Sequence, residues 1–305
     1  MDPTNYKTYI TELSAHDIDV KLASYLYSCS REAIDYLWWF HDNQTLELCE
    51  AAVECNGCAL RWIKPEFQTA DICRKAFRYG HGYELEWVKS ELKTYDLCAF
   101  AVRNDDIGNA LKYVPHALCD SELCLAAVSQ YGMALQYVPS ELRDLELCLT
   151  AVHQDGKALK HVPYELRDSK MCFEAVRQYG FALADVPPES CNLELCFTAV
   201  RQYGQALQCV PSDLCNFEIC FTAVRQNGGA LKYVPTILKT SELCLMAVCL
   251  HSGILISVPA KMRSLCVCAM AVNREKRDIF HVEENMRSEV WRVAGHDPAE
   301  NYPSV

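Results

Sequence analysis

The residues with the most obvious chemistry in this sequence are its 19 cysteines. Cys55 and Cys58 form a C-x-x-C motif, a spacing used both by redox-active thiol pairs and by half of a zinc site. His41 and His81 lie close enough in the chain to be considered as further ligands. However, the chain has no second C-x-x-C and no strand–helix–strand pattern around this one. The sequence therefore favours a structural role for Cys55 and Cys58, and we expect no cofactor and no metal ion.

Established catalytic motifs are absent from the sequence. It contains no G-x-x-x-x-G-K-[S/T], G-x-G-x-x-G, G-x-S-x-G or H-E-x-x-H. A catalytic site occupies one place, so it should interrupt a repetitive sequence, but the interruptions at 78–89 and 103–115 contain no evident acid–base set. We therefore expect a protein that is not an enzyme. A cysteine or metal site created only by folding stays open as an alternative.

A third set of candidates follows regularly spaced cysteines by five to seven residues. Its clearest copies lie within residues 153–230, and the candidate partner-binding residues are Arg177, Gln178, Tyr179, Arg201, Gln202, Tyr203, Arg225 and Gln226. Arginine and tyrosine are favoured at the hot spots of protein interfaces. On a helical wheel the arginines lie opposite the apolar face, so stacked copies would form an exposed ladder. The ladder fits either a protein-binding face or a solvated face paired with nearby acidic residues.

These candidates are positioned by a repeat of about 24 residues. One cysteine column runs through Cys49, Cys73, Cys98, Cys124, Cys148, Cys172, Cys196, Cys220, Cys244 and Cys268. Alanine follows three residues later, glycine eight residues later in most regular copies, and then Ala-Leu and Val-Pro. Four residues before each cysteine stands Thr, Ser, Asp or Asn, the residue types that cap helix N-termini. The pattern predicts an α-helix, a glycine that ends it in a left-handed conformation, a second short helix, and a turn opened by proline.

One such unit cannot bury its apolar stripe, but neighbours stacked in line can. The predicted fold is all-α, an α-solenoid of about ten two-helix repeats. We expect residues 1–44 to form an N-terminal cap with a degenerate first repeat, 45–282 to form the solenoid, and 283–305 to form a C-terminal cap and polar tail. An eleventh helix should begin near Met286.

The cysteine column lies on the buried helix face in this prediction. Adjacent copies would be about 8–10 Å apart, too far for a disulfide, so we expect reduced thiols and a cytoplasmic location. Cys119, Cys191 and Cys215 form another column just before the N-caps. We interpret this column as structural drift, that is, sequence variation at a structural position without a functional role.

The formal net charge of −11 argues against nucleic acid and against an anionic membrane surface as partners. No apolar run of 18 residues occurs, and the first residues lack the basic start and apolar core of a secretory signal. The expected partner is another protein, and the expected state is a monomer.

The string "AVRQNGGALKYVPTILKTSELCLMAV" and its copies over residues 45–293 resemble the repeat called domain of unknown function 4116. The resemblance implies a helical-repeat protein without carried-over catalytic residues. Some bacterial members of the family look like secreted effectors. The expected function is thus a protein–protein interaction scaffold, acting in a host cytosol if secreted. An inhibitor or regulator of another effector or toxin is the alternative within the same class.

Overall fold

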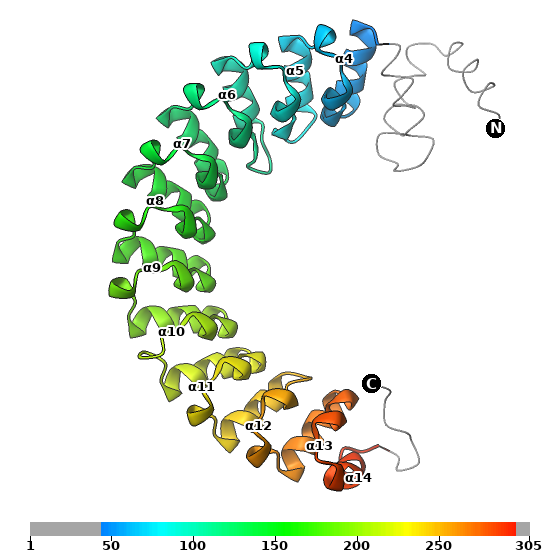
Figure 1. The fold of residues 1–305 in the computed structure, drawn as a ribbon, viewed down its shortest axis with the longest axis vertical. Helices are drawn as coiled ribbons and strands as arrows, with labels where there is room; N and C mark the ends of the chain where they lie inside the picture. Colours follow the sequence, from blue (N-terminus) through cyan, green and yellow to red (C-terminus); the bar gives the residue numbers. More distant parts are fainter. Residues whose placement is uncertain (1–43, 297–305) are drawn as a thin grey trace, which may run out of the picture. The chain divides into compact units, whose positions relative to one another are not determined.

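The computed structural model describes residues 44–296, in which helices are the only regular secondary structure (Figure 1). The chain divides into two compact units after Gln154. The α-helices of the first unit are α4 (Leu46–Cys55), α5 (Ala70–Arg78), α6 (Tyr95–Arg103), α7 (Ser121–Gln130) and α8 (Leu145–Gln154). Those of the second unit are α9 (Ser169–Gln178), α10 (Leu193–Gln202), α11 (Phe217–Gln226), α12 (Ser241–Leu250), α13 (Leu265–Arg274) and α14 (Glu284–Val293). Within each unit every α-helix packs against the next one along the chain, which confirms the predicted all-α stack of helical repeats.

The second helix of each repeat is a 3₁₀ helix. These are η1 (Gly57–Trp62), η3 (Tyr83–Trp87), η5 (Ala110–Tyr113), η7 (Gly132–Tyr137), η9 (Gly156–His161), η11 (Gly180–Asp185), η13 (Gly204–Cys209), η14 (Gly228–Tyr233), η16 (Leu255–Ser257) and η18 (Lys276–His281). A single 3₁₀ turn then leads to the next repeat in most copies, as η2 (Pro65–Phe67), η4 (Ser90–Leu92), η6 (His116–Leu118), η8 (Ser140–Leu142), η10 (Tyr164–Leu166), η12 (Pro188–Ser190), η15 (Thr236–Leu238) and η17 (Ala260–Met262). In many copies the proline is the residue immediately before this turn, as Pro139 is for η8.

The predicted N-cap column is confirmed in all ten copies. Each capping side chain accepts a hydrogen bond from the backbone N–H three residues later, as Asp168 does from Met171 at 2.7 Å. The other caps are Thr45, Thr69, Thr94, Asp120, Asp144, Asn192, Asn216, Thr240 and Ser264. A helix of ten residues leaves several N–H groups without an intrahelical partner, so these caps fix where each helix begins.

The column cysteines are all buried, with exposures of 0 or 1%. They lie between the buried Leu, Ala and Val positions of the same helix, for example Leu195, Cys196, Ala199 and Val200 in α10. Every cysteine that the structure describes is a free thiol. The column therefore fills the core as a small apolar residue, as predicted.

The predicted left-handed role of the repeat glycine is wrong. Left-handed backbone occurs in the described part of the chain only at Gly82, Gly108, Gly253 and Gly295, and none of these is the repeat glycine of a regular copy. The helices end instead at an extended residue, and the glycine starts the 3₁₀ helix. A Cβ atom on Gly180 would lie 2.7 Å from the carbonyl oxygen of Ala199 in the next repeat. The glycine is thus needed because the next α-helix approaches too closely for any side chain.

The eleventh helix exists as α14, and its N-cap residue, Glu283, makes no side-chain cap. The predicted N-terminal cap, apart from Gln44, and the tail beyond His296 lie outside the described residues. No α-helix among residues 44–296 combines the length and apolar character that crossing a bilayer requires.

Candidate functional site

The way each α-helix ends brings aromatic side chains together in the second unit. Tyr179 and Tyr203 directly follow α9 and α10, with extended backbone at φ of −138° and −136°. Each backbone N–H still donates to the helix, that of Tyr179 to the carbonyl of Ala175 at 2.8 Å. Each tyrosine therefore stands between the α-helix and the 3₁₀ helix of its own repeat.

Tyr179, Phe181 and Tyr203 form a cluster that we call the aromatic edge. The three ring centroids are 5.6 Å apart for Tyr179–Phe181, 5.7 Å for Phe181–Tyr203 and 6.0 Å for Tyr179–Tyr203. These separations are in the range of favourable aromatic pairs. Lys157 places its Nζ 5.2 Å from the Tyr179 ring centroid, and Tyr203 remains 42% exposed. The edge is therefore an ordered aromatic surface in contact with solvent.

A hollow of about 250 Å³ opens beside the aromatic edge. Phe181 and Tyr203 line one part of it, and Gln205, Gln226 and Asn227 line the rest. The hollow thus joins an apolar wall to amide groups, and it is large enough for one side chain of a bound segment.

The predicted arginine ladder borders this region. Arg177, Arg201 and Arg225 lie in the last turns of α9, α10 and α11, where positive charge is favoured by the helix dipole. Arg177 pairs with Glu174 of its own helix, with 2.6 Å between Nη2 and Oε1, and its side chain is 58% exposed. The guanidinium carbon of Arg201 lies 5.5 Å from the Phe197 ring centroid, and Arg225 is exposed.

The glutamines of the same triplets bridge consecutive repeats. The Nε2 of Gln226 donates to the carbonyl of Gln202 at 3.0 Å, while its Oε1 accepts the N–H of Gly204 at 2.6 Å. Gln202 donates to the carbonyls of Arg177 and Gln178, and Gln178 accepts the N–H of Gly156. The amide of Gln226 thereby satisfies both the open end of the preceding helix and the start of its 3₁₀ helix, whereas Gln202 bonds only the helix end and Gln178 the start of the 3₁₀ helix. The candidate residues Gln178, Gln202 and Gln226 therefore have a structural role whatever else they contact.

Replacing Gln226 with alanine should lower the free energy of unfolding by about 1–2 kcal/mol, because a buried N–H and a helix-end carbonyl lose their partner. Urea unfolding of the Gln226→Ala variant measures this loss. The control is Gln208→Ala, an exposed residue of η13 that should change stability by less than about 0.5 kcal/mol. Equal effects of the two substitutions would contradict the bridging role.

Phe181 is a part of this site that sequence reasoning missed. It follows the repeat glycine, at a position that holds Met133, Lys157 and Gln205 in other copies. The only sequence feature that could have indicated Phe181 was an aromatic residue at a variable position, two residues after a tyrosine. Only the packing of successive repeats shows that it contacts Tyr203 as well.

Residues from the two interruptions of the repeat lie close together in the first unit. In the first unit the Sγ of Cys58 lies 2.9 Å from the phenol oxygen of Tyr83 and 3.7 Å from Glu84 Oε1. The neighbouring His81 contacts Asp106 with 2.9 Å between Nδ1 and Oδ2. The carboxylate of Glu84 is fully buried and accepts the backbone N–H of His81 at 3.0 Å.

The pKa values of the Cys58 thiol and the Tyr83 phenol are both raised in this cluster. Burial, together with the negative charge of Glu84, raises the pKa of the Cys58 thiol, and the Cys58 contact raises the pKa of Tyr83. Both groups therefore stay protonated at neutral pH, whereas a cysteine nucleophile reacts as the thiolate. The side chain of Cys55 lies outside the described residues, so the structural role expected for the C-x-x-C motif stays a prediction. No group of three or more His, Cys, Asp or Glu residues suited to a metal ion occurs in the described part of the chain.

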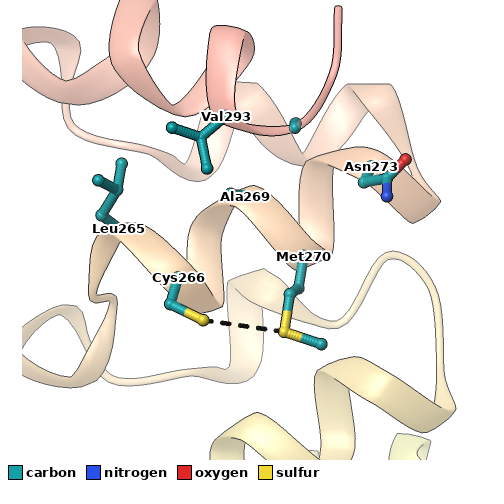
Figure 2. A pocket seen from close by; sticks show the side chains of 7 residues that line it. Leu265, Cys266, Ala269, Met270, Asn273 and Val293 are labelled. Carbon is teal, nitrogen blue, oxygen red and sulfur yellow. Dashed lines mark hydrogen bonds between the residues drawn. The ribbon is translucent and has the colours of Figure 1, made fainter.

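A second hollow, of about 280 Å³, lies between α13 and α14 (Figure 2). Leu265, Asn273 and Val293 are among the residues that line it. Cys266 and Met270 stand one helical turn apart in α13, with 4.0 Å between their sulfur atoms. The surface is mainly apolar and stands at the last repeat of the described chain.

The model of the family "Domain of unknown function (DUF4116)" matches residues 95–143, 144–189 and 192–239. Three consecutive segments of this chain thus match the family model. Each spans two of the 24-residue repeats, and together they include the arginine ladder and the aromatic edge. The resemblance indicated by the repeat pattern is confirmed over this stretch. No curated protein and no solved structure gives a significant match.

Proposed function

We propose that this DUF4116 repeat protein is a non-enzymatic scaffold that binds another protein through the aromatic edge and the arginine ladder of α9–α11. The observation that carries the proposal is the contact between Tyr179, Phe181 and Tyr203 on a solvent-exposed face. Exposed rings held in a fixed arrangement lose little side-chain entropy on binding, which is why tyrosine is frequent at interface hot spots.

The neighbouring charges indicate the chemistry of the partner. Arg201 and Arg225 make no ion pair within the described residues, and the hollow beside Tyr203 accepts one apolar or aromatic side chain. The fitting partner is a protein segment that carries one such side chain flanked by carboxylates. Free thiols throughout the described core also support a reducing, cytoplasmic place of action.

The test is an affinity purification from cell lysate with quantitative mass spectrometry, comparing the wild type with an Arg177→Glu, Arg201→Glu double variant. The recovered amount of a partner with flanking carboxylates should fall at least tenfold in the double variant. Each Arg→Glu substitution reverses a charge and so replaces attraction with repulsion. The control is an Arg274→Glu, Arg292→Glu variant, which makes the same charge change at two exposed arginines of α13 and α14. Proteins retained by both variants, or lost equally from both, would refute the assignment of the ladder as the binding face.

A further inference from the structure

The cysteines just before the N-caps are not isolated replacements. In the second unit the sulfur atoms of Cys191 and Cys196 are 3.8 Å apart, and those of Cys215 and Cys220 are 3.6 Å apart. In the first unit Cys119 and Cys124 occupy the same two positions of their repeat. Each pair joins the residue before the cap to the buried column cysteine five residues later, the two positions that pack together at many helix starts.

Other repeats use the position before the cap for a different bond. There a long polar side chain donates to a backbone carbonyl at the end of the 3₁₀ helix that follows, as Arg167 does to Asp185 at 2.7 Å. The same bond is made by Gln44, Gln68, Lys93, Lys239 and Arg263. A cysteine side chain is too short to make this hydrogen bond, so three repeats have a pair of thiols in its place.

The two thiols of each pair differ in access. Cys119, Cys191 and Cys215 are half-buried, whereas their partners in the column are fully buried. Burial raises the pKa of Cys191 and the contact with Cys196 opposes this rise, whereas the neighbouring Cys124 thiol lowers the pKa of Cys119. Burial raises the pKa of Cys196 and of Cys220 to about 12. The outer thiol can therefore meet a soluble oxidant, and the inner thiol stays protected until its partner has reacted.

We propose that Cys119–Cys124, Cys191–Cys196 and Cys215–Cys220 are three oxidation sites at which a hydroperoxide closes a disulfide within one repeat. The outer thiolate attacks hydrogen peroxide to give a sulfenic acid and hydroxide. The inner thiol then displaces water from the sulfenic acid and forms the S–S bond. The net reaction converts two thiols and one hydrogen peroxide into one disulfide and two waters, and a soluble thiol reverses it.

The sequence allows each pair to be followed separately. Trypsin cleavage after lysine and arginine places the pairs in three different peptides, 113–143, 178–201 and 202–225, and fragment ions of the last must distinguish Cys215–Cys220 from Cys209. It places Cys148 and Cys172, column cysteines without a thiol partner, in peptides 144–157 and 171–177, each with a single cysteine. The unpaired column cysteines are thus controls within the same sample.

The experiment treats the reduced full chain with hydrogen peroxide, then denatures it in N-ethylmaleimide and quantifies the peptides by mass spectrometry. We expect the three pair peptides to carry an internal disulfide, with both thiols of each pair protected from alkylation, while Cys148 and Cys172 are alkylated as in the untreated chain. A Cys191→Ser, Cys215→Ser variant should leave Cys196 and Cys220 alkylated, and should still close Cys119–Cys124.

Two results would overturn the proposal. One is full alkylation of all three pairs at a peroxide dose that oxidises the exposed Cys266. The other is the same pattern of disulfides when the chain is oxidised in urea, because the pairing would then come from proximity in sequence and not from the fold.

Discussion

Replacing Gly228 with alanine will destabilise the second unit by about 2–3 kcal/mol. The new Cβ would lie 2.5 Å from the carbonyl oxygen of Ala247 and 2.9 Å from the Cβ of His251, both in the next repeat. The oxygen belongs to the backbone of α12, so relief requires the two repeats to separate. Urea unfolding followed by circular dichroism measures the loss.

The adjacent glycine provides a matched control. Gly229 lies in the same 3₁₀ helix, but a Cβ there would first meet the side-chain atoms Asn227 Oδ1 at 3.0 Å and His251 Nε2 at 3.3 Å. Flexible side chains can move by a few tenths of an ångström, so Gly229→Ala should cost less than about 1 kcal/mol. Equal destabilisation by the two substitutions would show that close packing between repeats is not the reason for the glycine column.

Alkaline pH should destabilise the protein, because its buried column cysteines ionise more readily in the unfolded chain than in the folded one. Burial raises the pKa of Cys49, Cys98, Cys148 and Cys172 from 9.0 to about 11, and of Cys73, Cys196 and Cys220 to about 12. Above pH 9 the unfolded chain loses these protons and the folded chain keeps them, so stability is complete below pH 9 and falls as pH rises towards 11. Between pH 8 and pH 10 each such thiol should remove about 1.3 kcal/mol of stability.

The free energy of unfolding at pH 8 and pH 10, in the presence of a reductant, measures this dependence. A Cys148→Ala, Cys172→Ala variant should lose about 2–3 kcal/mol less between the two pH values than the wild type does. Cys266→Ala removes an exposed thiol and should leave the pH dependence unchanged. A double variant with the wild-type pH dependence would contradict the role of buried thiols.

The features that the sequence predicted are those encoded within one repeat. The caps such as Asp168, the buried cysteine column and the inward Leu, Ala and Val depend on local spacing along a helix, and a period of 24 residues reveals them. The features that it missed arise between repeats or between distant residues. Gly180 meets Ala199, Gln226 bridges to Gly204, and Phe181 meets Tyr203 only after the repeats stack.

The thiol pairs and the Cys58 cluster are also contacts that the repeat pattern in the sequence does not show. The interpretation of Cys191 and Cys215 as structural drift gave no reason to expect contacts with Cys196 and Cys220. The interruptions that hold His81 and Asp106 are 25 residues apart, yet adjacent repeats bring them into contact. A one-dimensional pattern identifies each column but does not show which columns touch.

The central claim, that the aromatic edge binds a protein, is tested most directly by site-specific photo-crosslinking. A photoreactive phenylalanine analogue at Tyr203 is compared in lysate with the same analogue at Ile237, a residue of η15 that is 90% exposed. We expect one or a few proteins to cross-link at Tyr203 and not at Ile237, and we expect Arg177→Glu with Arg201→Glu to abolish the product. The same proteins captured at both positions, or none captured at Tyr203, would contradict this claim.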